Sequence, residues 1–162
     1  MVEVDASDML GKFNSIEQSV LPWTIDKSEA KRYIGLSDIY DGSNNMLEIK
    51  KNTNWEYKFP AFSWCARLGP DWYLPAENEL KLLLCNKEIY KKVNNSLIQI
   101  GAPQLFIKPW FWQTAKHYCS SNEDIQGEIV TAIDGIRIKY VPEADWGGFK
   151  TEKFAVRAFA KF

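Results

Sequence analysis

The amino-acid sequence predicts a single α+β domain, and three observations carry this prediction. Apolar residues recur at helical spacing through the middle of the chain, between Pro60 and Leu97. After Pro109 the pattern changes to short apolar runs typical of strands, and Asp134-Gly135 between two such runs is the strongest hairpin signal in the chain. The length of 162 residues fits one domain with a core of ordinary size.

The start of the chain is polar and weakly patterned, so residues 1–30 are predicted to be an N-terminal extension. This extension is expected to contain a short helix around Met9–Val20 that ends at Pro22. The domain proper, residues 31–162, is expected to begin near Arg32.

Helices are expected next, each with a recognisable start or stop. Turn-forming residues from Asp41 to Asn45 can cap the first helix. Proline favours the first turn of a helix and glycine favours its end, which places the second helix. Apolar stripes place the third and fourth helices. The predicted helices are Met46–Lys50, Pro60 to Gly69, Ala76–Leu84 and Asn86 to Gly101.

Strands are expected in the C-terminal part of the chain. Two runs flank Asp134-Gly135 as the arms of a hairpin, an aromatic run precedes them, and an alternating run follows. The predicted strands are Trp110–Thr114, Glu128–Ile133, Ile136–Tyr140 and Lys153–Phe159. Since the helices come first, the expected arrangement is an antiparallel sheet closed by the C-terminal strand.

The charge balance argues against two classes of partner. The chain has 20 Lys and Arg residues against 21 Asp and Glu residues, so no strong field attracts nucleic acids or anionic membranes. No apolar run reaches the length of a transmembrane helix, and no signal peptide pattern opens the chain. We therefore expect no nucleic-acid partner and no membrane insertion. The protein is expected to be cytoplasmic, or a surface, secreted or phage protein trimmed of its leader.

Several strings in the chain fit one bacterial pattern. They are Ile34-Gly35-Leu36-Ser37-Asp38, Asp41-Gly42, Phe59-Pro60-Ala61-Phe62, Trp72-Tyr73-Leu74-Pro75-Ala76 followed by Glu79-Leu80, and Val156-Arg157-Ala158-Phe159. With these strings, residues 31–162 resemble the bacterial domain family found at the C-terminus of collagen-like adhesins, a branch of the C-type-lectin-like superfold. The resemblance implies helices packed on a twisted antiparallel sheet with long irregular loops. It also implies a non-enzymatic recognition domain of adhesin-like or receptor-binding type.

The resemblance also indicates where a ligand would bind. In this superfold the loop region after the helices often contacts ligands, and here the chain departs from the family at Phe111–Lys116 and in a long polar stretch from His117 to Glu128. We expect these loops and the segment near Trp146 to bind a glycan or a protein. The candidate ligand-binding residues are Trp112, Gln113, Lys116, His117, Tyr118, Asn122 and Trp146.

Calcium is considered because many lectins of this superfold bind sugars through it. One short segment before the first predicted helix is rich in side-chain oxygen atoms, at Asp38, Asp41, Ser43 and Asn45. Their spacing does not match an EF-hand loop, and helix capping explains them. No sugar-binding tripeptide of the calcium lectins is present in the chain. No cofactor and no metal site are therefore predicted, and calcium stays open as an alternative without support from a motif.

Catalytic patterns are scarce, so the protein is predicted not to be an enzyme. The sequence has no nucleophile elbow, no P-loop and no dinucleotide-binding fingerprint. Its single histidine, His117, stands two positions before Cys119, which leaves a thiol–imidazole pair open. Two alternatives stay open: a thiol- or metal-dependent enzyme related to the formylglycine-generating oxidases of the superfold, and a structural fibre or pilus component.

Overall fold

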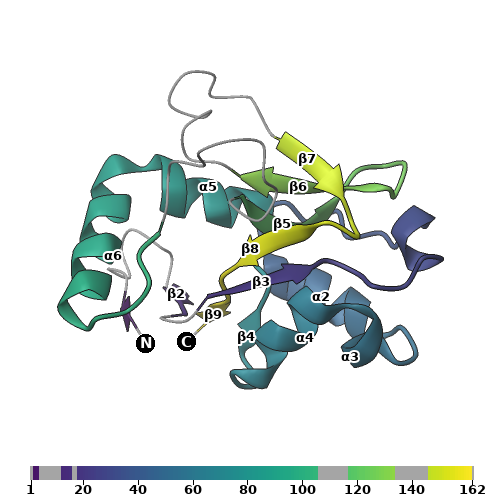
Figure 1. Cartoon of the computed structure of the whole chain (residues 1–162), viewed down its shortest axis with the longest axis horizontal. Coiled ribbons are helices and arrows are strands. Elements are labelled where there is room, and N and C mark those ends of the chain that lie inside the picture. Colours follow the sequence, from purple (N-terminus) through teal and green to yellow (C-terminus); the bar gives the residue numbers. More distant parts are fainter. Residues whose placement is uncertain (1, 4–11, 16–17, 106–116, 134–145, 162) are drawn as a thin grey trace.

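The computed structural model describes residues 2–3, 12–15, 18–105, 117–133 and 146–161. Within these residues the chain is an α+β domain, as the sequence predicted (Figure 1). Figure 1 shows the larger sheet through the middle of the molecule, with α2, α3 and α4 grouped on one side and α5 and α6 at one end. The helices are η1 (Glu29–Lys31), α2 (Gly42–Lys50), α3 (Trp55–Lys58), α4 (Pro60–Arg67), α5 (Glu77–Cys85) and α6 (Lys87–Gln99).

The strands form two sheets. The larger has the order β3 (Ser19–Pro22), β8 (Lys153–Val156), β5 (Tyr118–Glu123), β6 (Ile129–Ile133) and β7 (Trp146–Phe149). The smaller has the order β1 (Val2–Glu3), β2 (Lys12–Asn14), β9 (Phe159–Lys161) and β4 (Trp72–Tyr73). Among the described strands every pairing is antiparallel except that of β5 with β8, which is parallel. The larger sheet is therefore mixed rather than purely antiparallel.

The four predicted helices are present as α2, α4, α5 and α6. Asp41 caps α2 by accepting a hydrogen bond from the Ser43 amide, so this helix begins at Gly42, earlier than predicted. Asn86 caps α6 through the amides of Glu88 and Ile89. These caps satisfy amide groups that have no partner inside the helix, which explains why local sequence located the helices well.

The predicted helix near the N-terminus is wrong where the structure describes it, because β2 and β3 occupy this part of the chain. β3 pairs with β8 and β2 pairs with β9. Trp23, directly after β3, is buried and packs edge-on against Phe59 and Phe62, with ring centroids 5.6 and 5.0 Å away. Residues before position 31 thus contribute to both sheets and to the core.

The predicted C-terminal strand is divided between the two sheets. β8 ends at Val156, and β9 begins at Phe159 in the smaller sheet. Between them the buried Arg157 donates hydrogen bonds to the carbonyl oxygens of Ser15 and Pro103, at 2.6 and 2.7 Å. The Arg157 side chain thus connects the segments around Ser15 and Pro103 to the point where the chain passes from the larger sheet to the smaller one.

Of the other predicted strands, β6 matches the first arm of the hairpin. The second arm, Ile136–Tyr140, and the aromatic run Trp110–Thr114 lie outside the described residues. Within the described part β6 pairs with β5 on one side and β7 on the other.

Candidate functional site

The seven predicted ligand-binding residues fall into two groups. Trp112, Gln113 and Lys116 lie outside the described residues, and Trp146 is described only as the backbone position that opens β7. His117, Tyr118 and Asn122 are buried in or beside β5. In this structure these three side chains therefore offer little surface to a ligand, and the predicted site as a whole stays a prediction.

Residues 118–123 were expected to belong to an exposed loop, and this expectation is wrong. They form β5, and all six are buried. The polar side chains serve the fold: the Asn122 amide donates to the carbonyl oxygens of Leu36 and Asp38 and accepts from the Glu77 amide. Polar composition suggested exposure, but the side chains of Asn122 and Glu123 have backbone partners in distant segments.

Glu123, the last residue of β5, anchors the segment before α2. Its Oε1 atom accepts hydrogen bonds from three successive amides, those of Ile34, Gly35 and Leu36, at 2.8, 2.7 and 3.0 Å. Gly35 has a φ of +100°, a conformation that L side chains rarely adopt. The glycine lets successive amides converge on one carboxylate oxygen, as in an anion-binding nest.

Lys150 neutralises the same carboxylate from the other side. Its Nζ atom lies 2.5 Å from Glu123 Oε2, and both side chains are 0% exposed. The ammonium group also donates to the carbonyl oxygens of Arg32 and Glu29 and lies 4.6 Å from the centroid of the Trp23 ring. Burial lowers the pKa of Lys150 and Glu123 opposes that shift. We call Glu123 and Lys150 the buried ion pair.

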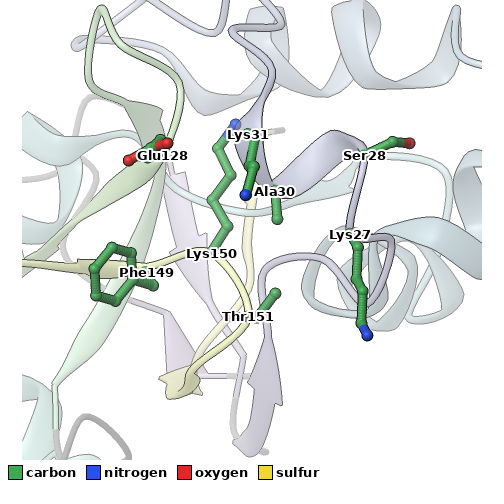
Figure 2. A pocket seen from close by; sticks show the side chains of 8 residues that line it. All are labelled: Lys27, Ser28, Ala30, Lys31, Glu128, Phe149, Lys150 and Thr151. Carbon is green, nitrogen blue, oxygen red and sulfur yellow. The ribbon is translucent and has the colours of Figure 1, made fainter.

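A cleft of about 590 Å³ opens beside the buried ion pair (Figure 2). It lies between the segment that carries η1, the turn from β7 to β8, and the residue before β6. Its lining residues are Lys27, Ser28, Ala30, Lys31, Glu128, Phe149, Lys150 and Thr151. Figure 2 shows the Lys150 side chain running between Phe149 and Glu128 on one side and Ala30 on the other. The volume falls within the range of about 300–1,000 Å³ that is common for ligand pockets.

Three side chains that line the cleft, those of Phe149, Lys27 and Lys31, are available for binding. Phe149 is 58% exposed, so its ring is accessible at the cleft. The ammonium groups of Lys27 and Lys31 are exposed and form no hydrogen bond or ion pair with the residues that the structure describes. Lys27 and Lys31 lie on one wall, and Phe149 and Glu128 lie opposite them. The cleft can therefore accept an anionic group beside a flat apolar face.

None of the seven predicted ligand-binding residues lines this cleft. Lysines 27 and 31 lie in the segment predicted to be an extension, and Phe149 and Lys150 follow the predicted hairpin. The two halves are brought together by the pairing of β3 with β8 and by the buried ion pair. Local sequence patterns do not predict contacts between segments that are far apart in the chain.

The oxygen-rich stretch at the start of α2 is engaged in capping. Asp38 accepts hydrogen bonds from the amides of Tyr40 and Asp41 and from the Asn44 side chain. Asp41 also forms an ion pair with Lys161. Among the described residues no group of three metal-ligating side chains comes together.

The two buried thiols are in poor surroundings for nucleophilic chemistry. Burial raises the pKa of Cys119 to about 12 and that of Cys65 well above its ordinary value. Reactive thiols have a lowered pKa, because the thiolate is the nucleophile. Cys85 is exposed, and none of the three thiols is in a disulfide.

No helix in the described part of the chain is long and apolar enough to cross a membrane.

Comparison with known proteins gives one informative likeness. No protein-family model matches the chain, and no curated protein matches it. The crystal structure of a fimbrial protein from Bacteroides ovatus is similar, with a TM-score of 0.62 and 18% sequence identity. The likeness covers 94% of this chain and 36% of the fimbrial protein, so the chain spans about a third of that neighbour's length. At this identity the likeness shows the fold alone, and the resemblance to the collagen-like adhesin family stays a prediction.

Proposed function

We propose that this chain is a non-enzymatic recognition domain of a bacterial surface protein, with a C-type-lectin-like fold, that binds its ligand in the cleft beside the buried ion pair. The observation that carries the proposal is the cleft itself. It combines an exposed aromatic ring with two lysines that have no partner in the described part of the chain. Aromatic rings are enriched at recognition surfaces, and an ammonium group without a partner can form a charge-assisted hydrogen bond with an anionic ligand.

The floor of the cleft favours specific binding. Lys150 is held by Glu123 and by two backbone carbonyl groups, so its position does not depend on a ligand. A site built on fixed groups loses less conformational entropy when a ligand binds. The η1 segment is fixed as well, since Glu29 pairs with Lys58 and Arg32.

The lining predicts the chemistry of the ligand. An acidic sugar or an acidic side chain would lie against Lys27 and Lys31, with its apolar face on Phe149. Such binding would not require calcium, because the lysines supply the positive charge. The fold likeness to a fimbrial protein supports a place on the cell surface.

A binding screen tests this function. The purified chain is applied to a glycan array and to bacterial and host cells, with calcium and with EDTA. The double variant Lys27→Glu/Lys31→Glu should lose roughly tenfold or more in affinity for any calcium-independent hit, because a hydrogen bond to a charged group contributes about 1.5–3 kcal/mol.

A matched control is Lys87→Glu/Lys91→Glu on the exposed face of α6, which changes the net charge by the same amount. It should bind as the parent chain does. If both double variants lose the same affinity, the effect is one of net charge alone. If Lys27→Glu/Lys31→Glu keeps the affinity of the parent chain, the ligand does not bind in the cleft.

A structural fibre component is the second candidate, favoured by the same fimbrial likeness. It predicts ordered self-association. Light scattering at increasing protein concentration separates the two functions, since a recognition domain should keep the same mass while it binds its ligand.

A further inference from the structure

A second hollowed surface lies over the helices and shares no lining residue with the cleft. One hollow of about 250 Å³ is lined by residues of α2, β4, the segment before β4 and Lys161, and one of about 370 Å³ is lined by residues of α2, α3 and α4. Lys50 lines both hollows, so they are neighbours. We call this surface the tryptophan face and define it by Lys50, Trp55, Glu56, Arg67, Asp71 and Trp72.

Each hollow has one tryptophan in its wall. Trp55 and Trp72 are half-buried and pack against the hydrophobic core on one side, which fixes the ring positions. Lys50 Nζ lies 5.9 Å from the centroid of the Trp55 ring. A tryptophan ring is a large flat surface whose face carries partial negative charge. It therefore attracts weakly positive C–H groups as well as cations.

Charged groups surround the two rings, and they do not neutralise one another. Lys50, Arg67, Glu56 and Asp71 form no ion pair with any residue that the structure describes. Arg67 donates one hydrogen bond to the Ser63 hydroxyl, at 3.1 Å, which leaves other donors of its guanidinium group free. Lys161, in contrast, is already paired with Asp41 and Ser43. Two cations and two anions remain, so the surface offers donors and acceptors without a net charge.

We propose that the tryptophan face binds a neutral oligosaccharide, with one sugar ring in each hollow. A sugar ring has one face of C–H groups, which matches a tryptophan face, and a rim of hydroxyl groups that both donate and accept hydrogen bonds. The carboxylates of Glu56 and Asp71 accept from these hydroxyls, and Arg67 and Lys50 donate to them. The balanced charges disfavour a polyanion, and the separation into two hollows suits a chain of linked rings.

This site is separate from the cleft and does not rest on the function proposed for it. The cleft has an excess of free lysines and no tryptophan, whereas the tryptophan face has balanced charges and two tryptophans. A ligand suited to one is poorly suited to the other.

The test titrates the full chain with maltotriose, cellotriose, mannotriose and chitotriose, followed by tryptophan fluorescence and calorimetry. At least one trisaccharide should bind saturably. Glu56→Gln and Asp71→Asn should each weaken that binding by roughly tenfold, because each removes a charged acceptor from one hollow. Both residues are exposed, so neither change should alter the unfolding midpoint.

Trp55→Ala should remove most of the binding and leave only the weaker fluorescence response of Trp72. The control is Lys27→Glu/Lys31→Glu, which should bind the trisaccharide as the parent chain does. Absence of saturable binding to all four sugars would overturn the proposal. So would binding that survives both carboxylate changes, or binding that is lost only in the cleft control.

Discussion

The cleft and the tryptophan face are both hollowed, but different forces position their walls. The cleft depends on one buried ion pair between Glu123 and Lys150, which holds the η1 segment against the larger sheet. The tryptophan face lies on short helices that are capped locally and packed on the core, as at Asp41 and Pro60. One surface is positioned by long-range electrostatics, and the other by local structure and apolar packing.

This difference determines how independently each surface can change. A substitution at the floor of the cleft affects folding before it affects binding, since an unpaired buried charge is costly. The exposed residues of the tryptophan face can change with little effect on stability. Ligand specificity can therefore vary freely on the tryptophan face, but in the cleft only at its rim.

The largest effect on stability is expected at the buried ion pair. Glu123→Gln or Lys150→Met alone should lower the free energy of unfolding by about 3–5 kcal/mol, because each leaves one buried charge without its partner. Combining both changes should cost less than the sum of the two, since no charge is then left unpaired. Urea denaturation measures each variant.

Glu48→Gln is the control for this prediction. Glu48 pairs with Lys51 on the surface of α2, where both side chains are largely exposed, so the change should stay within about 0.5 kcal/mol. If Glu123→Gln and Glu48→Gln lower the free energy of unfolding equally, the buried ion pair does not hold the cleft together.

An intermediate effect is expected at Gly127, where the turn between β5 and β6 meets the η1 side of the cleft. Its φ is +77°, and an added Cβ would lie 2.2 Å from the Tyr33 amide nitrogen. Gly127→Ala should therefore cost about 2–4 kcal/mol, from backbone strain and from the clash. Gly101 has a similar φ of +67° but open space around it, so Gly101→Ala should cost only about 1–2 kcal/mol. Equal costs in thermal or urea unfolding would show that the close approach contributes nothing.

The smallest effect on stability is expected at Asp41, which caps α2 on the side of the tryptophan face. Burial raises the pKa of Asp41, but hydrogen bonds from Lys161 and Ser43 outweigh it and hold that pKa below its ordinary value of 3.8. A carboxylate with a lowered pKa stabilises the fold above 3.8, and the contribution is lost as the pH falls below that value.

Asp41→Asn keeps a side chain that can cap α2, so it should lose less than about 1 kcal/mol at neutral pH. The difference between variant and parent should vanish at low pH. Urea unfolding across the acid range checks this, and a difference that grows towards low pH would contradict it.

The sequence located the helices well because their signals are local. Asp41, Pro60 and Asn86 act on amides within the same turn. It failed for β2 and β3, whose conformation depends on pairing with strands at the other end of the chain. It failed for β5 as well, because the polar residues there are buried against backbone groups of residues 34–38 and 77.

The strings that suggested a family also have a structural basis in this chain. Glu79 accepts hydrogen bonds from the Tyr73 hydroxyl and from the amides of Ala76 and Gly42. A Cβ on Gly42 would lie 2.2 Å from the Leu74 carbonyl oxygen, so only glycine fits there. These residues specify the junction of α2, β4 and α5, and therefore point to a fold rather than to a ligand.

The pairing of β3 with β8 also sets the order in which the protein can fold. Val20 lies opposite Ala155, so the edge of the larger sheet closes only when nearly the whole chain is present. Helices α2 to α6 lie between these two strands in the chain, but α2 and α5 also pack against β5, so their packing is completed only after β5 has been synthesised. β3 therefore stays without its partner strand until β8 has been synthesised, and an unpaired strand edge favours aggregation of an incompletely folded chain.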